Sequence, residues 1–320
     1  MSPLSPDDLA GIAVPDPGAL IALRQHAREI SLFPRRQALS IQGGGYRSRF
    51  RGRGMEFDEA RPYQPGDDVR AIDWRVTART ATTYTKVFRE ERERPVLIAV
   101  DLRSPMFFGS QRLKSLAACD VAALLAWAGL AAGDRVGGLV FGPGRQWDSR
   151  ARRGRHGVLR LVQHLTEACQ ALYDATITGE GEGDDPALAT ILGDCRRVAT
   201  PGAAVVVISD FHDLDDDCEK HLFELARHCD LTLCQVSDIL EQDLPPPGLY
   251  NIRDGDAPRL LDSRRGKSRE LFARQAHQRR AALAAVAARL AMPLLHFAAE
   301  QPVLPALRRA FAPRAGRRRS

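Results

Sequence analysis

The sequence lacks the segments that mark several classes of protein. Its six cysteines include no C-x-x-C pair, so their spacing supports neither a zinc knuckle, a redox motif nor a disulfide framework. The longest apolar run, Leu116 to Ala132, is interrupted by Asp120 and falls short of the roughly 20 residues that a bilayer requires. It predicts a buried helix and no membrane span. The first 18 residues are acidic and proline-rich, unlike a secretory signal, and we expect a cytoplasmic protein.

Motifs of common enzymes are also missing. There is no G-x-x-x-x-G-K-[ST], and Gly179, Gly181 and Gly183 alternate with glutamates that would repel a phosphate. There is no G-x-S-x-G, and the histidines show no pattern of partners for a nucleophile. We therefore expect a protein that is not an enzyme.

Lysine is scarce, and the two signs of charge are unevenly distributed. Of 46 basic residues only four are lysines. The formal net charge of +6 comes entirely from arginines in the last twenty residues. Residues 172–220 carry twelve acidic and three basic residues. Such an acidic stretch repels phosphate and attracts cations or basic partner surfaces.

The apolar pattern after residue 94 alternates between strand and helix. Continuous apolar runs predict buried strands; they lie at 95–102, 133–142, 202–211, 230–238 and 291–299. Residues 145–154 are predicted to pair with 133–142 as a hairpin. Helices are predicted between the strands, at 111–132, 155–172, 186–199, 218–229, 269–290 and 303–311. This alternation predicts an α/β fold, a Rossmann-like three-layer domain with helices on both faces of the sheet.

The composition divides the chain into four parts. Residues 1–32 are read as a leader and a short helix, and 33–94, rich in glycine, arginine and turn residues, as a small N-terminal β-rich subdomain. Residues 95–312 form the Rossmann-like domain, and 313–320 a basic tail.

Two aspartates follow predicted parallel strands, where ligands bind in open sheets. Asp101 ends the first strand and Asp210 the third, and Asp184 and Asp185 precede a helix. Carboxylates in this position suit a divalent cation, which would allow a metal-dependent hydrolase. They equally suit helix capping, and the residues alone leave both readings open.

An arginine-rich stretch suggests an alternative function. Arg47, Arg49, Arg51 and Arg53 recur at period two, so that on a strand they share one face, and Tyr46 and Phe50 lie nearby. Together with the arginine tail they could bind single-stranded nucleic acid. Acidic residues at 56–68 could pair with these arginines instead, and we do not expect nucleic acid to be the main partner.

Residues 52–80, GRGMEFDEARPYQPGDDVRAIDWRVTART, closely resemble the bacterial domain of unknown function 58 family. The residues that carry the match are Glu56, Phe57, Arg61, Tyr63, Gly66, Asp67, Asp68, Arg70, Ile72, Asp73, Trp74, Ala78 and Arg79. The resemblance, from about residue 35 to 312, implies a von Willebrand factor A-like domain. It also implies a MoxR-type AAA+ ATPase as partner and a role in assembling or maturing a client protein that the sequence does not name.

The resemblance also implies a metal site, from which this sequence departs. The D-x-S-x-S motif of von Willebrand factor A domains reads Asp101, Leu102, Arg103, Ser104, Pro105 here. Asp210 matches a later acidic position, and Ser104 is one residue out of register. Arg103 is expected to replace the cation by pairing with Asp101 or Asp210. We therefore expect weak Mg²⁺ binding or none, and no other cofactor.

The remaining polar residues are assigned to contacts. Arg103 and the acidic residues after the third strand, namely Asp213, Asp215, Asp216 and Asp217, are predicted to bind the protein partner. In the motif block, Asp67 or Asp68 is predicted to cap a helix. Arg70, Asp73 and Arg79 are predicted to form a charge network around Trp74. That network would be either a partner surface or the clamp that holds the N-terminal subdomain to the sheet.

Overall fold

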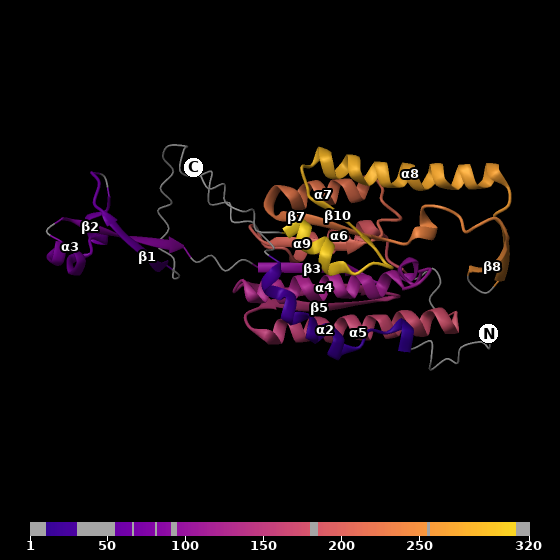
Figure 1. The fold of residues 1–320 in the computed structure, drawn as a ribbon, viewed down its shortest axis with the longest axis horizontal. Helices are drawn as coiled ribbons and strands as arrows, with labels where there is room; N and C mark the ends of the chain where they lie inside the picture. Colours follow the sequence, from indigo (N-terminus) through magenta and orange to yellow (C-terminus); the bar gives the residue numbers. More distant parts are fainter. Residues whose placement is uncertain are drawn as a thin grey trace. The chain divides into compact units, whose positions relative to one another are not determined.

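The computed structural model describes residues 11–30, 55–65, 67–80, 82–90, 95–179, 185–254 and 257–311. The chain forms two compact units, one of residues Arg35–Glu93 and one of Met1–Pro34 with Arg94–Ser320. The ribbon of both is drawn in Figure 1. The predicted arginine face at 47–53, the tail at 313–320 and Gly66 lie outside the described residues.

A six-stranded sheet forms the centre of the larger unit. Its strands are β3 (Pro95–Asp101), β4 (Arg135–Gly142), β5 (Arg145–Arg152), β6 (Ala204–Ser209), β7 (Asp230–Ser237) and β10 (Leu294–Ala298). They lie in the order β10-β7-β6-β3-β4-β5, and only the β4–β5 pair is antiparallel. Counted from β3, this is the doubly wound order 3-2-1-4-5-6 of Rossmann-like sheets. The predicted fold class and the hairpin are confirmed.

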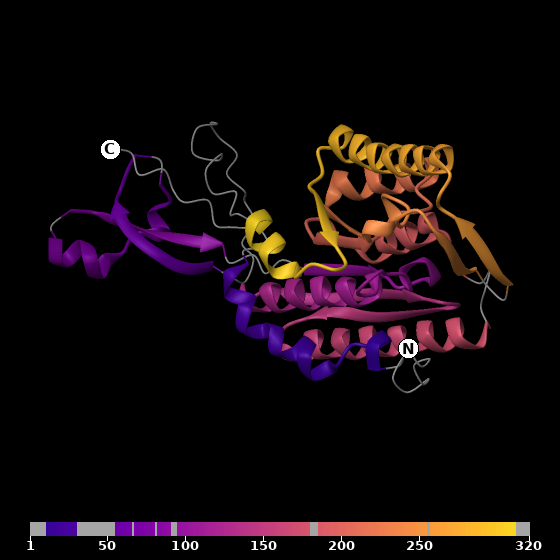
Figure 2. The same ribbon diagram turned by 45° about the vertical axis from the view of Figure 1, so that its right-hand side comes forward.

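Helices cover both faces of this sheet (Figure 2). One face carries α4 (Lys114–Ala131), α5 (Arg155–Thr178) and α9 (Val303–Phe311). The other carries α6 (Leu188–Val198), α7 (Asp216–His228) and α8 (Gly266–Arg289). The shorter elements are the 3₁₀ turns η3 (Ser104–Met106) and η4 (Ile239–Glu241) and the hairpin of β8 (Leu249–Asp254) and β9 (Ala257–Asp262). Helix α5 runs six residues beyond the predicted end at 172 and stops at Gly179, which has a φ of 71°.

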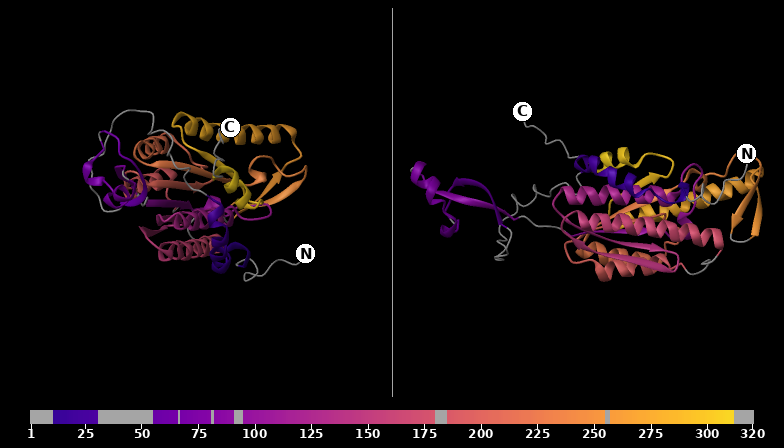
Figure 3. Two further views of the ribbon diagram at one scale, coloured as in Figure 1. Left: turned by 60° about the vertical axis from the view of Figure 1, so that its left-hand side comes forward. Right: turned by 90° about the horizontal axis from the view of Figure 1, so that it is seen from below.

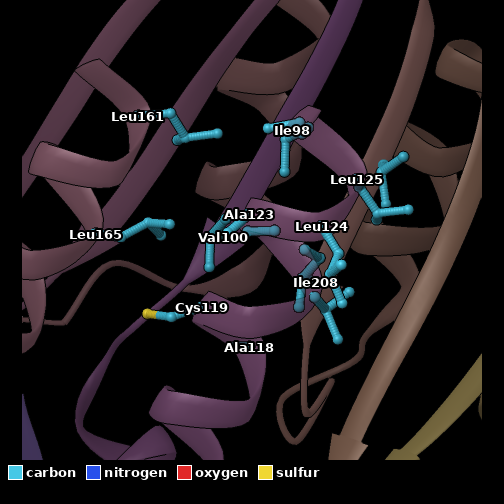
Figure 4. Close-up of a cluster of buried hydrophobic side chains, with 14 of the residues drawn as sticks. Ile98, Val100, Ala118, Cys119, Ala123, Leu124, Leu125, Leu161, Leu165 and Ile208 are labelled. Atoms are coloured by element: carbon cyan, nitrogen blue, oxygen red, sulfur yellow. The ribbon is translucent and has the colours of Figure 1, made fainter. Parts of the chain in front are cut away.

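Alternate residues of each central strand enter different cores. In β3, Val96, Ile98 and Val100 pack toward α4 and α5, and Leu97 and Ala99 pack toward α6 and α7. Figure 4 shows Ile98 and Val100 among side chains of α4 and α5. Because both faces are covered, the strand is apolar at every interior position, as parallel strands in α/β proteins are.

Helix α4 is the innermost helix of the domain. Its length and composition would allow it to cross a membrane, yet 78% of its 18 residues are buried within the protein. Leu124 and Leu125 at its centre are fully buried (Figure 4). The run therefore serves as the predicted core helix.

Part of the predicted leader packs against this helix. Asp16 accepts hydrogen bonds from the backbone of Gly18 and Ala19, and Pro17 occupies the first turn, so α2 (Pro17–Ala22) begins there. The turn η1 (Leu23–Glu29) follows. Trp127 of α4 donates its indole N–H to the carbonyl of Leu20 at 3.0 Å. Figure 3 shows these indigo N-terminal elements beside the main body.

The smaller unit is built on an antiparallel strand pair. β1 (Met55–Pro62) pairs with β2 (Tyr84–Glu90), with a register shift between Phe57 and Glu59. The segment between the strands forms the 3₁₀ turn η2 (Val69–Ala71) and the helix α3 (Trp74–Thr80). The described residues of this unit, which composition predicts to be β-rich, include the strand pair β1 and β2.

Replacing Leu124 by alanine tests whether α4 is the core of the domain. We expect Leu124→Ala to lower the free energy of unfolding by about 2–5 kcal/mol, since the side chain has no exposed surface and leaves a cavity. The matched control is Leu271→Ala on α8, where the side chain is 54% exposed, with a change of about 0.5 kcal/mol or less. Urea unfolding measures both, and equal losses would contradict this role of α4.

Candidate functional site

A cluster of charged side chains lies at the carboxyl ends of the parallel strands. Asp101 ends β3, Asp210 follows β6 and Asp238 follows β7. Because parallel strands end at the same edge of the sheet, the three carboxylates converge there. All three are buried, with Asp101 only 2% exposed. Buried carboxylates need cations or hydrogen-bond donors, and this edge supplies both.

Arg103 supplies the first cation. Its Nε and Nη2 donate to the two oxygens of Asp101 at 2.9 and 2.8 Å. Its Nη1 and Nη2 donate to the two oxygens of Asp213 at 2.8 and 2.9 Å, and Nη1 also donates to the carbonyl of Pro186 at 2.8 Å. The guanidinium has five N–H groups, so every one of them is hydrogen-bonded.

A backbone turn after β6 brings Asp213 to Arg103. Phe211 has a φ of 54°, in the left-handed region that non-glycine residues seldom adopt. Its N–H donates to the hydroxyl of Ser209 at 3.0 Å, and its side chain is buried in the core beneath α6 and α7. Asp213 also accepts the backbone N–H of Leu188, at the start of α6, at 2.9 Å. The Arg103–Asp213 pair thus joins β3, the β6–α7 loop and α6.

Lys114 supplies the second cation, at the first residue of α4. Its side chain is 1% exposed, and Nζ donates to Asp210 Oδ2 at 2.7 Å and to Glu241 Oε1 at 2.5 Å. Asp210 therefore pairs with Lys114, and the predicted alternative of an Arg103–Asp210 pair is wrong. No motif indicated Lys114; the one signal was a rare lysine at the start of an apolar helix.

The loop after β7 holds the far side of the cluster. Asp238 accepts from the backbone N–H and the hydroxyl of Ser110 at 2.8 and 2.9 Å, and from the N–H of Leu240 at 2.8 Å. The Glu241 side chain accepts the N–H of Asp238 at 3.0 Å, which completes a capping box around η4. This hydrogen bond fixes the position of the Glu241 carboxylate, which also accepts from Lys114.

The environment of each group moves its pKa. Burial would lower the pKa of Lys114, but Asp210 and Glu241 outweigh burial and raise it. Burial would raise the pKa of Asp213, but the hydrogen bonds from Arg103 and Leu188 outweigh burial and lower it. Burial raises the pKa of Asp101, although Arg103 and Ser209 donate hydrogen bonds to it. Lys114 and Asp213 are both held in their charged forms.

The residues at this edge do not fit a divalent cation. Both oxygens of Asp101 accept from Arg103, and Asp210 Oδ2 accepts from Lys114. Ser104, weighed as a metal ligand, is exposed, and its backbone N–H donates to Asp185 Oδ2 at 2.9 Å. Asp185 Oδ1 is buried without a hydrogen-bond partner within the described part, but one oxygen is not a ligand set. In the same part of the chain, no three His, Cys, Asp or Glu side chains are arranged for a metal.

The predicted partner-binding residues divide into buried and exposed ones. Arg103 is 3% exposed, and all of its N–H groups bond within the chain, so it has no free donor for the predicted contact with a partner. Asp213 pairs with Arg103, yet 39% of its side chain stays exposed. Asp215 caps α7 by accepting the N–H of Cys218 at 2.8 Å, and it remains exposed with Asp216 and Asp217. These three residues, the first acidic turn of α7, form the exposed acidic surface of the site.

In the smaller unit the acidic motif residues serve local turns. Asp67 accepts from Arg61 Nη2 at 2.7 Å and from the N–H of Gln64 at 2.9 Å. Asp68 caps η2 by accepting the N–H of Arg70 at 3.0 Å. Tyr63 donates its hydroxyl to the carbonyl of Asp67 at 3.4 Å. Glu56 and Phe57 lie on β1.

The predicted charge network around Trp74 is wrong. Asp73 accepts the backbone N–H groups of Arg75 and Val76 at 3.1 and 3.2 Å, as a cap of α3. Among the described residues it forms no ion pair with Arg70 or Arg79. Trp74 is 70% exposed within its unit. Asp68 and Asp73 therefore act as local caps of η2 and α3.

These observations define the class of protein: a Rossmann-like α/β domain in which an arginine and a lysine pair with the buried carboxylates at the strand ends. The chain belongs to the DUF58 family, described as proteins of unknown function, whose model matches residues 59–282. Two uncharacterized proteins, from Mycobacterium tuberculosis and Mycobacterium bovis, are each 28% identical to it over 287 residues, covering 88% of this chain and 85% of theirs.

Two solved structures are similar at low sequence identity. The conserved hypothetical protein BatB from Bacteroides thetaiotaomicron matches with a TM-score of 0.41 and 14% identity, over 68% of this chain and 96% of that one. A von Willebrand factor type A structure from Catenulispora acidiphila matches with a TM-score of 0.30 and 14% identity, over 49% of this chain and 35% of that one.

Removing the buried lysine tests the charge cluster. We expect Lys114→Met to lower the free energy of unfolding by about 3–5 kcal/mol, because Asp210 and Glu241 lose their cation. The double variant Lys114→Met/Asp210→Asn should recover part of that loss. Lys220→Met is the control, since that exposed lysine pairs with exposed Asp217, and we expect the free energy of unfolding to stay unchanged. Urea unfolding that shows similar losses for both single variants would contradict the cluster.

The raised pKa of Lys114 also predicts a pH dependence. The folded-state pKa lies above the unfolded one, so the stabilisation is complete below the ordinary value of 10.5 and is lost as pH rises through the folded value. The difference in free energy of unfolding between the wild type and Lys114→Met should therefore be constant up to about pH 10 and narrow above it. Denaturant unfolding at several alkaline pH values measures this difference. A difference that widens as the pH rises would contradict the prediction.

Proposed function

We propose that this protein is a non-catalytic adaptor in the cytoplasm that binds a MoxR-type AAA+ ATPase and helps to assemble or mature a client protein. The partner class comes from the family resemblance. The observation that carries the proposal is the contrast at the strand ends, where the buried charges are paired with one another and the acidic turn of α7 is left exposed.

The chemistry of the buried cluster supports a role in binding. A catalytic group needs a free donor, acceptor or proton-transfer path to a substrate. All five donors of Arg103 are used within the protein, and the Lys114 ammonium lies between two carboxylates. Such groups fix the loops that carry them. We propose that the adaptor works without a metal ion at this edge of the sheet.

The exposed acidic surface supports a basic partner. Asp215, Asp216 and Asp217 project from the start of α7, whose N-terminus is held by the Asp215 cap. The loop before them is held by Asp213 on Arg103. A charged surface on a fixed backbone attracts a complementary surface without an added cost of ordering the loop.

The test is capture of the partner by the full-length tagged protein, with and without ATP and magnesium. We expect an AAA+ ATPase of the MoxR type to co-purify in a nucleotide-dependent manner. The variant Asp215→Asn/Asp216→Lys/Asp217→Lys should weaken binding of the purified ATPase at least tenfold, since it reverses the surface and keeps a capping oxygen at 215. Calorimetric titration measures this affinity.

A control of equal charge change separates the surface from net charge. Glu167→Gln/Asp174→Lys/Glu270→Lys alters exposed residues of α5 and α8 and should leave the affinity unchanged. Loss of binding in both variants would mean that the net charge of the protein, and not the acidic surface of α7, determines the affinity. Full binding by the α7 variant would remove the acidic surface from the proposal.

A further inference from the structure

The edge strand β5 contains a bulge, which the adaptor proposal does not use. Ser149 lies opposite Gly138 of β4, and Arg152 lies opposite Val136, so three steps along β5 match two steps along β4. Val136 packs into the core on the side of α4 and α5. Residues that lie opposite each other on paired strands face the same side of a sheet. The extra residue therefore places Arg152 on the face of α5, whereas in a regular strand it would share the other face with Asp148.

Two glycines make room for this geometry. A Cβ atom at Gly137 would lie 2.4 Å from the backbone nitrogen of Ala151, which belongs to the bulge. A Cβ atom at Gly157 would lie 2.5 Å from the carbonyl oxygen of Val136. Neither position accepts a side chain unless the backbone shifts, and glycine is the residue that allows so close an approach. Gly137 thus admits the bulge, and Gly157 brings the first turn of α5 against the sheet close to Arg152.

A cavity of about 650 Å³ is lined by this part of β5 and the first turns of α5. Its cationic groups include the guanidinium groups of Arg150 and Arg152 from β5 and of Arg160 from α5. In the part of the chain that the structure describes, none of these three arginines forms an ion pair or a side-chain hydrogen bond. Unpaired guanidinium groups around one cavity attract an anion, and their planar donors match the oxygens of a phosphate.

Other exposed arginines of the same unit have acidic partners. Arg196 of α6 pairs with Glu224 of α7, and Arg289 of α8 pairs with Glu219 of α7. Around the cavity, Asp148 is the one carboxylate in the lining, and it lies opposite Leu139, on the face of β5 away from α5. The positive charge on the α5 side is therefore left for a ligand. The first turn of α5 has no side-chain cap, and its backbone N–H groups add to the positive potential.

The lining favours phosphate groups over a nucleobase or a long nucleic acid. Recognition of bases commonly relies on aromatic side chains on which they stack. The lining contains no Phe, Tyr or Trp, and the neighbouring Trp147 is buried. Asp148 would repel a phosphate backbone that continued across the strand. Three guanidinium groups exceed what one phosphate needs, so the cavity fits a short chain of phosphates.

We propose that the cavity between β5 and α5 binds a short phosphate chain, either inorganic or the triphosphate group of a nucleotide. Arg152 holds the chain from the strand and Arg160 holds it from the helix. Arg150 contacts a further phosphate group. The site recognises the phosphates and makes no contact that depends on a base.

Calorimetric titration of the full-length protein with sodium tripolyphosphate, ATP and AMP tests the class of ligand. The buffer contains no divalent cation and about 0.15 M salt, which screens isolated exposed charges. We expect tripolyphosphate to bind, ATP to bind no more tightly, and AMP to bind at least tenfold more weakly than tripolyphosphate. Equal affinities for tripolyphosphate and ATP would indicate that a nucleotide can supply the chain, and weaker binding of ATP would indicate an inorganic chain.

Three results of this titration would overturn the proposal. The first is no binding of tripolyphosphate. The second is tighter binding of ATP than of tripolyphosphate, which would show that the base is recognised. The third is tighter binding of hexaglutamate or of a ten-residue oligothymidine, which would assign the cavity to an acidic peptide or a nucleic acid.

Matched double variants assign the binding to the cavity. Arg152→Ala/Arg160→Ala should weaken the binding of tripolyphosphate at least tenfold. Arg274→Ala/Arg279→Ala removes the same charge from exposed positions of α8 and should leave the affinity unchanged. Circular dichroism confirms that both variants fold. Equal weakening in the two variants would mean that net charge determines the affinity, and would overturn the site.

Hydrogen–deuterium exchange locates the ligand on the unaltered protein. This measurement is needed because arginines at 47–53 and 314–319 also attract phosphate. Tripolyphosphate should slow the exchange of backbone amides in residues 148–160 and leave residues 272–284 of α8 unchanged. Slower exchange that is confined to segments outside 148–160 would show that the phosphate chain binds elsewhere.

Discussion

The structure depends on how the carboxylates at the strand ends are neutralised. Asp101 and Asp210 lie side by side in the fold because β3 and β6 are parallel neighbours, and both are buried. Two ionised carboxylates in such a place repel each other unless cations or donors accompany them. Arg103 and Lys114 supply these cations from within the chain. Charged side chains of the protein itself therefore hold the loops at this edge together.

This arrangement has a cost and a structural consequence. Burial of an ion pair costs the hydration free energy of both groups. The pair therefore stabilises the fold only when all of its donors and acceptors are hydrogen-bonded. The guanidinium of Arg103 meets that condition, and its contacts with Asp213 and Pro186 tie the starts of α6 and α7 to β3. These contacts thus fix the backbone that carries the exposed acidic turn at Asp215–Asp217. A surface of this kind is suited to selecting a partner by charge.

The sequence allowed the fold to be predicted further than the site. Runs such as Val96–Val100 are apolar at every position, which only a strand covered on both faces requires, and topology then placed Asp101 and Asp210 at one edge. The second partner of Arg103 was missed because Asp213 reaches it through the left-handed turn at Phe211, and a phenylalanine gives no signal for such a turn. Lys114 was missed because it is thirteen residues beyond Asp101 and belongs to no motif.

The uneven distribution of charged residues explains why the net charge says so little about this chain. Residues 145–160 contain six arginines and one aspartate, and residues 172–220 contain twelve acidic and three basic residues. Both segments belong to the same domain, one beside the sheet edge at β5 and the other around the strand ends at β6. Regions of opposite charge on one compact unit orient an approaching charged molecule as well as attract it. Each region repels the molecules that the other attracts. The local charge at each region therefore decides which molecules it attracts, and the net charge of +6 describes neither region.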